Sequence, residues 1–371
     1  MATVRINIGK QENEVPEKSF DEMSLMEKFR FQFKDRKAAA RKSANASKRY
    51  AQLTYIFQIT TQLYMFLYYI VPRLFEDYDG WTQYWLKVLC VFLCVEWIMN
   101  YFCTVCYSTD ISKTRDNPTI EMKEKWENPP DYFESRLSNR TFSNSNGHAR
   151  QLMNSPPDDG GMPWTYCEVC DIYIPPRAHH CNVCQKCILK RDHHCYFVGT
   201  CIGFRNQRYF YVFAFYNAII GSVGLYFTIT YLQTFYCQND CSWTNYLPPV
   251  AVYKYFYGSE EFGFHCIILV IHIYTEFLAC LLGTVYCCAQ TTLCTLGITM
   301  FEFSKMNDLS KQFRVKNNNS INANFRSVFG DFWALNFIFP MPILFKQRED
   351  GCKWDGVKID YNGNCQKRNC E

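Results

Sequence analysis

The feature that most constrains this chain is a cysteine- and histidine-rich stretch from Cys167 to Cys201. It holds seven of the 21 cysteines and four of the seven histidines in a chain of 371 residues. Ligand-capable residues recur there in three C-x2-C steps, at Cys167, Cys181 and Cys184. A C-x2-C turn brings two thiolates to one metal ion at the roughly 2.3 Å of a Zn–S bond. The repeated steps and interleaved histidines therefore predict a zinc-binding domain.

The alternative interpretation of this stretch is a disulfide framework, which requires an oxidising compartment. The membrane topology argued below places the stretch in the cytosol, where thiols stay reduced, so the sequence favours metal. The seven cysteines, Cys195 included, together with His180 and His194 give nine candidate ligands, whereas two tetrahedral sites need eight. One cysteine is left over, and it is the candidate for chemistry.

Long apolar blocks outside this stretch predict membrane spans. Aromatic residues make up 18% of the chain, with 31 Phe and 26 Tyr. About 20 apolar residues suffice for a helix to cross a bilayer. The predicted spans are residues 53–72, 88–107, 209–236 and 267–290. We therefore expect a mainly α integral membrane protein with a four-helix transmembrane bundle.

The distribution of positive charge orients these spans. Residues 1–52, 108–208 and 294–371 carry 12, 13 and 11 Lys or Arg, and only three lie elsewhere. The positive-inside rule then places both termini and the Cys/His stretch in the cytosol. The resulting regions are a cytosolic arm (1–52), spans one and two (53–107), a linker rich in Pro, Asn and Ser (108–163), a two-zinc domain (164–208), spans three and four (209–293) and a cytosolic C-terminal region (294–371).

Polar residues inside the predicted spans favour structural roles. Glu96 is interpreted as a buried hydrogen-bond partner rather than a functional carboxylate. His272 and Glu276 are four residues apart and share a helix face, which favours a bundle-facing pair over a proton pathway. Cys237 and Cys241 lie in the non-cytosolic loop, where an oxidising environment would allow them to pair.

Other segments are expected to meet the membrane surface or the bundle. Basic residues interleave with Phe29, Phe31 and Phe33, which favours an interfacial segment over a solvated arm. Proline interrupts the aromatic patch 332–345 too much for a fifth span, so it should dock on the bundle or lie on the membrane. Candidate acylation sites near the cytosolic end of span four are Cys287, Cys288 and Cys294.

The surplus cysteine is best assigned to Cys195 in Asp192-His193-His194-Cys195. If His194 binds metal, His193 is available to take a proton from Cys195. Asp192 can then orient the imidazole and stabilise its protonated form, as in acyl transfer by a nucleophile, a base and an orienting group. The alternatives are that His193 is another metal ligand or a neighbour of one, and that Asp192 accepts from a ligating histidine.

The position of Cys195 at the membrane boundary selects an amphiphilic substrate. Thioesters are natural acyl donors for a thiol, and the chain of a fatty acyl-CoA can enter the bundle while its nucleotide stays in the cytosol. Lys190, Arg191, Arg205 and Arg208 are candidates for its phosphates, with a solvated charged loop as the equal alternative. A nucleic-acid-binding zinc finger is disfavoured because the span from Tyr209 ties the domain to the membrane.

The sequence closely resembles the DHHC family of protein S-acyltransferases. The resemblance rests on Pro176–Cys181 (PRAHHC), Asp192–Cys195 (DHHC), the cysteine spacing and the four-span layout. Thr299-Met300-Phe301-Glu302 resembles the family's TTxE motif, with Met300 in place of the second threonine. Asn324 and Phe329-Gly330 are similar to a C-terminal motif whose asparagine hydrogen-bonds backbone near the last span.

The resemblance implies two structural zinc ions and an acylated cysteine. By position, one zinc would use Cys167, Cys170, His180 and Cys187, and the other Cys181, Cys184, His194 and Cys201. Cys195 would take a palmitoyl-like acyl group from acyl-CoA and pass it to membrane-proximal cysteines of target proteins. The implied location is an endomembrane, Golgi or ER, with the plasma membrane as an alternative.

Four positions after the nucleophile depart from the family pattern. The family usually has Pro-Trp directly after it and two asparagines before the last ligand, where this chain has Tyr196-Phe197 and Gly199-Thr200. Without proline the backbone beside Cys195 is less constrained, and a misplacement of about 1 Å can cost about 100-fold in rate. The competing functions are a zinc-stabilised membrane adaptor that binds client proteins without acyl transfer, and a transporter that would use Glu96, His272 and Glu276.

Overall fold

The computed structural model describes residues 49–50, 52–111, 164–236, 242–258, 263–307, 313–338, 347 and 350–361. All of them belong to the compact unit formed by residues 44–371. The expectations for Phe29, Phe31 and Phe33, for most of the 108–163 linker, and for Cys237 and Cys241 lie outside the described residues.

Three helices are long and apolar enough to cross a membrane: α3 (Gly80–Cys106), α8 (Gln207–Phe235) and α10 (Phe264–Leu296). They coincide with the second, third and fourth predicted spans. At the first predicted span, residues 52–65 are helical and continue through the π-helix η2 (Phe66–Ile70) into α2 (Val71–Leu74). A crossing by this segment, and hence a four-span bundle, stays a prediction.

The π-helix has a local cause. Pro72 lies in the first turn of α2, where it lacks an N–H and its ring would collide with the carbonyl four residues earlier in a regular α-helix. The wider turn of η2 just before it relieves that collision. The chain therefore continues as a helix past the proline.

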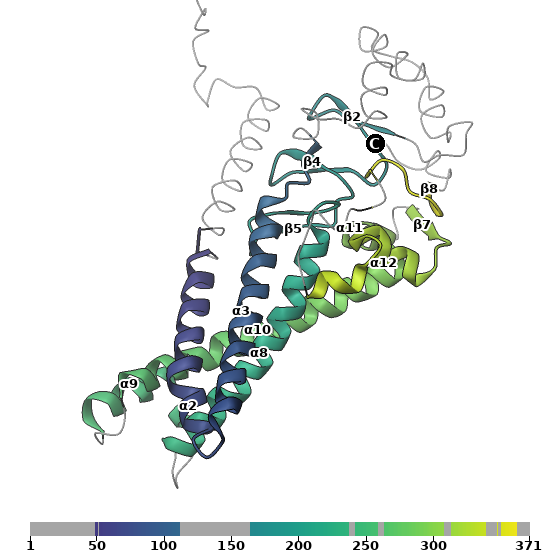
Figure 1. Cartoon of the computed structure of the whole chain (residues 1–371). Helices are drawn as coiled ribbons and strands as arrows, with labels where there is room; N and C mark the ends of the chain where they lie inside the picture. Colours follow the sequence, from purple (N-terminus) through teal and green to yellow (C-terminus); the bar gives the residue numbers. More distant parts are fainter. Residues whose placement is uncertain are drawn as a thin grey trace, which may run out of the picture. The chain divides into compact units, whose positions relative to one another are not determined.

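Helix α8 lies between α3 and α10 and packs against both (Figure 1). Two glycines allow α8 and α10 to approach closely. A Cβ at Gly221 would lie 2.5 Å from the backbone nitrogen of Cys280, and one at Gly283 would lie 2.5 Å from that of Ala218. Small residues at helix contacts are typical of membrane bundles.

Several polar residues of the long helices are buried inside the bundle, among them Glu96, Asn100, His272 and Glu276. Asn100 Nδ2 donates to the backbone carbonyl of Glu96 over 2.8 Å and lies 3.5 Å from the Glu96 carboxylate oxygen Oε2. His272 Nδ1 lies 3.9 Å from Glu276 Oε1, with both side chains buried. Thr228 Oγ1 also donates to Glu276 over 3.3 Å. These contacts agree with structural roles for Glu96 and the His272–Glu276 pair.

Residues 242–258, between α8 and α10, contain helical structure where the sequence predicted a loop. It contains the 3-10 helix η5 (Trp243–Tyr246) and the helix α9 (Pro248–Tyr257). Proline at the first helical position favours the start of α9, a signal that the sequence analysis missed. Ala251 is buried where α9 packs against α10.

Six short strands form three separate antiparallel hairpins between α3 and α8. The strands are β1 (Thr165–Cys167), β2 (Ile172–Ile174), β3 (His179–Cys181), β4 (Lys186–Ile188), β5 (His193–Cys195) and β6 (Thr200–Ile202). They contain all the predicted histidine ligands and Cys195.

After α10 the chain returns to these hairpins and to the bundle. Its elements are α11 (Met300–Met306), β7 (Phe313–Asn317), α12 (Ile321–Phe329), η6 (Trp333–Phe337) and β8 (Val357–Tyr361), with β7 and β8 paired antiparallel. Trp333 and Phe337 pack against the aromatic core of the bundle, so the described part of the 332–345 patch is docked. Asn324 Nδ2 donates to the Thr295 carbonyl over 2.9 Å, near the end of α10.

Candidate active site and metal centres

The three hairpins share one design. In each, the cysteine that ends the first strand accepts a hydrogen bond at its carbonyl from the backbone N–H four residues later. The pairs are Asp171 to Cys167 (2.8 Å), Gln185 to Cys181 (2.7 Å) and Gly199 to Cys195 (2.8 Å). The donor residue has a positive φ in every case. We call these turns knuckles one (167–171), two (181–185) and three (195–199).

Each of the first two knuckles meets a His–Cys pair on the next hairpin. Knuckle one places Cys167 and Cys170 beside His180 and Cys187, which are cross-strand partners in β3 and β4. Knuckle two places Cys181 and Cys184 beside His194 and Cys201, which are partners in β5 and β6. The structure thus brings together the two sets of four that the resemblance implied.

The donor atoms of each set fit one tetrahedral zinc ion. Within each set the four ligand atoms lie within 4.8 Å of one another. Cys170 Sγ is 3.3 Å from His180 Nδ1, Cys184 Sγ is 3.2 Å from His194 Nδ1, and Cys184 Sγ is 3.5 Å from Cys201 Sγ. Zn–S bonds of about 2.3 Å give tetrahedral edges of about 3.8 Å. Bound zinc would cross-link consecutive hairpins, which are otherwise only three residues per strand.

Knuckle three departs from the design at one position. Cys195 occupies the place of Cys167 and Cys181, but Val198 stands where the other knuckles have their second cysteine. Instead of a fourth hairpin, α8 begins at Gln207. Among the described residues, Cys195 therefore belongs to neither cluster, although it has the backbone setting of a ligand.

Asp192 and His193 lie directly before this cysteine. Asp192 is buried, and its Oδ2 is 2.8 Å from His193 Nδ1. Burial disfavours the imidazolium, but Asp192 and Cys195 favour it more strongly and raise the pKa of His193 to about 9. With Nδ1–H donated to Asp192, Nε2 is the atom left for the thiol. Nε2 is buried and lacks a hydrogen-bond partner among the described residues.

Aromatic side chains from the helices surround Cys195. It is part of a buried cluster with Tyr55, Trp97, Tyr101 and Phe213, which come from residues 52–65, α3 and α8. Phe197 lies over this cluster, with its ring 6.1 Å from that of Phe213. The thiol thus sits where the zinc-capable hairpins meet the apolar interior of the bundle.

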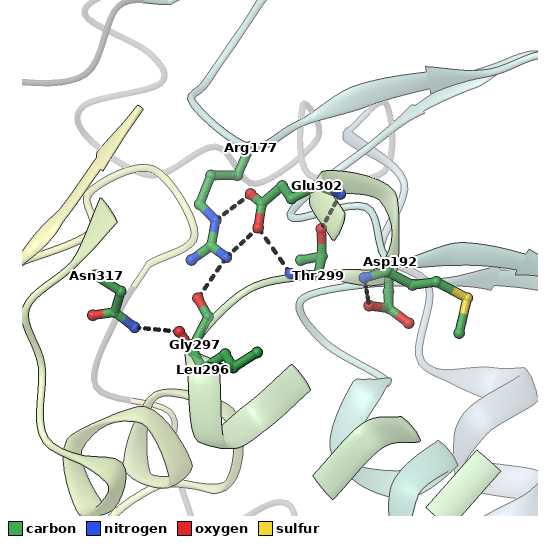
Figure 2. Close-up of polar contacts among 8 residues, drawn as sticks. Arg177, Asp192, Leu296, Gly297, Thr299, Glu302 and Asn317 are labelled. Atoms are coloured by element: carbon green, nitrogen blue, oxygen red, sulfur yellow. Dashed lines mark hydrogen bonds and ion pairs between the residues drawn. The ribbon is translucent and has the colours of Figure 1, made fainter. Parts of the chain in front are cut away.

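A buried ion pair joins the segment between the first and second hairpins to α11. The Arg177 Nε and Nη2 atoms are each 2.7 Å from a carboxylate oxygen of Glu302, and the two side chains are 2% and 1% exposed. Arg177 Nη2 also donates to the carbonyl of Gly297, which ends α10 (Figure 2). Burial opposes ionisation of Glu302, but Arg177 outweighs it and holds the pKa of this carboxyl below its usual value.

The same glutamate organises the start of α11. Glu302 Oε2 accepts from the Thr299 backbone N–H over 2.8 Å, and Thr299 Oγ1 accepts from the Glu302 backbone N–H over 3.2 Å. This reciprocal capping box fixes the first turn of the helix. The next backbone N–H, that of Met300, donates to Asp192 Oδ1 over 2.7 Å. Figure 2 shows the contacts of Arg177 with Glu302 and of Glu302 with Thr299, and beside them the separate contact that Asp192 accepts from Met300, the next residue after Thr299.

Comparison with protein families gives a match over this region. Residues 161–307, from the first hairpin through α11, match the family model described as DHHC palmitoyltransferase. We call this matched region, residues 161–307, the DHHC domain. A search of curated proteins found no match to the chain.

The DHHC domain is covered on one side by the C-terminal segment. The Trp354 ring centroid lies 4.9 Å from the Arg177 guanidinium carbon and 4.9 Å from Lys190 Nζ. The same ring packs edge-on against Phe204 at 5.6 Å. Gln347 adds hydrogen bonds to the carbonyls of Phe204 and Val328, over 2.8 and 2.9 Å.

The burial of two of the four predicted phosphate-binding residues shows that this part of the prediction is wrong. Lys190 and Arg208 are buried, Lys190 beside Trp354 and Arg208 against Tyr209, so neither is a solvated loop residue nor open to a phosphate. Arg191 and Arg205 are partly exposed. Of the candidate acylation sites, Cys288 is exposed and Cys287 partly exposed, but Cys294 is buried.

Sequence reasoning missed Arg177 and the symmetry of the DHHC domain. A 14-residue spacing relates Cys167, Cys181 and Cys195, and the same spacing relates Cys170, Cys184 and Val198. That repeat was visible and would have singled out Cys195 directly. The partnership of Arg177 with Glu302 spans 125 residues, and no local pattern signals it.

Proposed function

We propose that this protein is a protein-cysteine S-acyltransferase that moves a fatty acyl group, palmitoyl-like, from acyl-CoA to cysteines of target proteins. The observation that carries the proposal is the setting of Cys195. It is the knuckle cysteine outside both clusters, it follows the Asp192–His193 pair, and it faces the aromatic interior of the bundle. The DHHC palmitoyltransferase family match is consistent with this chemistry.

In the first step, His193 Nε2 takes the thiol proton of Cys195 and the thiolate attacks the acyl-CoA carbonyl. A new C–S bond forms to Cys195 while the bond to the CoA sulfur breaks. The imidazolium returns its proton to the departing CoA thiolate. Asp192 holds the Nδ1–H and stabilises the transient positive charge, as an orienting carboxylate does in other covalent acyl transfers.

In the second step, a target cysteine replaces CoA. His193 takes its proton, the new thiolate attacks the Cys195 thioester, and the acyl group moves while Cys195 leaves as a thiolate that recovers the proton. The two thioesters are similar in energy, so each direction of transfer is governed by the concentrations of donor and acceptor. The kinetics should be ping-pong.

The zinc ions have a structural role in this proposal. Cys167, Cys170, His180 and Cys187 would hold one ion, and Cys181, Cys184, His194 and Cys201 the other. Zinc would supply cross-links that hold the three hairpins rigid, because four-residue sites without an open position are typical of structural zinc. Residue His194 would thereby fix the backbone next to Cys195.

The protein would act on membrane-proximal cysteines from the cytosolic side. The apolar blocks support four spans with the three hairpins between spans two and three, and the charge distribution supports cytosolic termini. An endomembrane, Golgi or ER, is the proposed location, with the plasma membrane as the alternative. Nucleic acid is not a proposed partner.

The test is autoacylation of purified protein by labelled palmitoyl-CoA, with zinc content measured on the same sample. We expect hydroxylamine-sensitive label on the wild type and on Cys352→Ala, which alters a buried cysteine outside both clusters. Cys195→Ser should carry no such label. A folded, zinc-loaded wild type that forms no thioester would overturn the proposal in favour of the adaptor.

A further inference from the structure

Asp192 has a third hydrogen-bond donor, and it comes from the membrane bundle. Gln290 Nε2, on α10, donates to Asp192 Oδ2 over 2.9 Å. This is the oxygen that also meets His193 Nδ1 at 2.8 Å. Gln290 is fully buried. The amide therefore acts on the carboxylate oxygen that orients the proposed base.

A second glutamine fixes which way the Gln290 amide points. Gln207 Nε2 donates to Gln290 Oε1 over 3.1 Å, and Gln207 is itself buried at the first position of α8. An amide has one accepting end and one donating end. With its oxygen held by Gln207, Gln290 must present its N–H to Asp192. A flipped amide would set oxygen against a carboxylate oxygen.

The start of α8 is in turn rigidly held. Asn206, the residue before Gln207, donates from Nδ2 to the carbonyls of Thr104 on α3 and Cys201 on β6, over 3.1 and 3.0 Å. Its Oδ1 accepts from the Gly203 N–H over 2.9 Å. Asn206 thus joins α3, the third hairpin and the start of α8, and Gln207 projects from this junction.

We infer that Gln290 and Gln207 are positioning residues for the acyl transfer at Cys195. Gln207 fixes the orientation of the Gln290 amide, and Gln290 in turn holds Asp192 Oδ2. The position of this carboxylate oxygen sets the tilt of the His193 ring toward the thiol. This inference rests on the proposed function. It adds that α8 and α10 supply part of the catalytic alignment in addition to a site for the acyl chain.

The test compares two near-isosteric changes at position 290. Gln290→Met keeps the side-chain length and removes the amide, and Gln290→Glu keeps the shape but sets a carboxylate against Asp192. Single-turnover acylation of Cys195 is measured over a range of palmitoyl-CoA concentrations. We expect the maximal rate constant to fall about tenfold in Gln290→Met, the scale of one lost hydrogen bond to a charged group, and further in Gln290→Glu.

If Gln290 had only a structural role, its loss would not lower the maximal rate constant while leaving the KM for palmitoyl-CoA unchanged. We expect the KM for palmitoyl-CoA, the zinc content and the melting temperature of Gln290→Met to match those of Gln83→Met. That control loses a hydrogen bond to the Phe75 carbonyl near the start of α3. Gln207→Met should show a smaller loss of rate than Gln290→Met, because the Gln290 amide remains but is free to flip.

The experiment distinguishes a failure of this inference from a failure of the proposed function. A labelled wild type with an unchanged rate in Gln290→Met and Gln207→Met would overturn this inference and leave the proposed function standing. A loss of rate matched by equal losses of zinc and of thermal stability would also overturn it. A folded wild type without any label would overturn both.

Discussion

The Met300 backbone N–H donates to Asp192 Oδ1 over 2.7 Å, so α11 touches the proposed catalytic aspartate through its main chain. The family's TTxE motif has threonine at this position, and a thioether cannot donate a hydrogen bond. Because the contact uses the backbone, the methionine side chain does not interrupt it. The capping box of Thr299 and Glu302 is what aims this N–H at Asp192.

Replacing Met300 with proline should remove this contact without breaking the helix. Met300 is the first residue of α11, where proline is tolerated. Thr299 before it is extended, as a residue preceding proline prefers to be. We expect Met300→Pro to slow acylation of Cys195 about tenfold, and Met300→Leu, which keeps the N–H and the volume, to react at the wild-type rate. Equal rates in all three proteins would contradict a role for this N–H.

Breaking the Arg177–Glu302 pair should strongly destabilise the domain. Arg177→Met leaves a buried carboxylate without its partner, which typically costs about 3–5 kcal/mol. Glu302→Gln in the same protein removes the stranded charge, so the double variant should recover much of the loss. Free energies of unfolding from denaturant titration of the four proteins form the cycle, and additive effects of the two changes would show that the pair is not coupled.

The same pair predicts a loss of stability in acid. The native pKa of Glu302 is held below its ordinary value, so the unfolded state takes up a proton first as the pH falls. Stability from this group is present above about pH 4.3, its unfolded pKa, and declines as the pH drops toward the native pKa, by up to about 1.4 kcal/mol per pH unit. The wild type should therefore lose stability below that pH faster than Arg177→Met/Glu302→Gln. Parallel curves would be the contrary result.

The zinc content of a variant that lacks one ligand should show that the two clusters bind separate ions. Cys184 lies in only one of them, so we expect two zinc ions per chain in the wild type and about one in Cys184→Ser. Because structural zinc contributes roughly 10 kcal/mol or more to folding, we also expect the variant to be strongly destabilised. Elemental analysis of purified protein measures this, with Cys352→Ala as the matched control. Two ions in Cys184→Ser would refute the assignment.

Much of the fold follows from local patterns in the sequence. Three of the four predicted spans coincide with α3, α8 and α10, because continuous apolar composition over a membrane thickness leaves few alternatives. The C-x2-C steps and interleaved histidines predicted a zinc-binding domain, but the grouping of the ligands into two sets of four came from the resemblance to the DHHC family and not from local spacing. Pro72 was included in the first predicted span, but the π-helix before it was not foreseen.

The sequence did not reveal the polar contacts between segments that are distant in the chain. Gln290 looks like any polar residue near the end of an apolar helix, and its contact with Asp192 spans 98 residues. Lys190 reads as a solvated lysine, yet Trp354 from the C-terminal segment covers it. Such contacts depend on how helices and hairpins pack, and this is set by the whole bundle rather than by neighbouring residues.

The cover provided by Trp354 has a consequence for biosynthesis. Arg177 and Lys190 are made before α8 and α10, whereas Trp354 is made after both. Since chains are synthesised from the N-terminus, the face that bears Arg177 stays open while the two later helices emerge, and Glu302 also arrives only after them. The DHHC domain therefore reaches its final packing late, and a nascent chain whose last helices fail to insert would keep an unpaired arginine exposed to the cell's quality control.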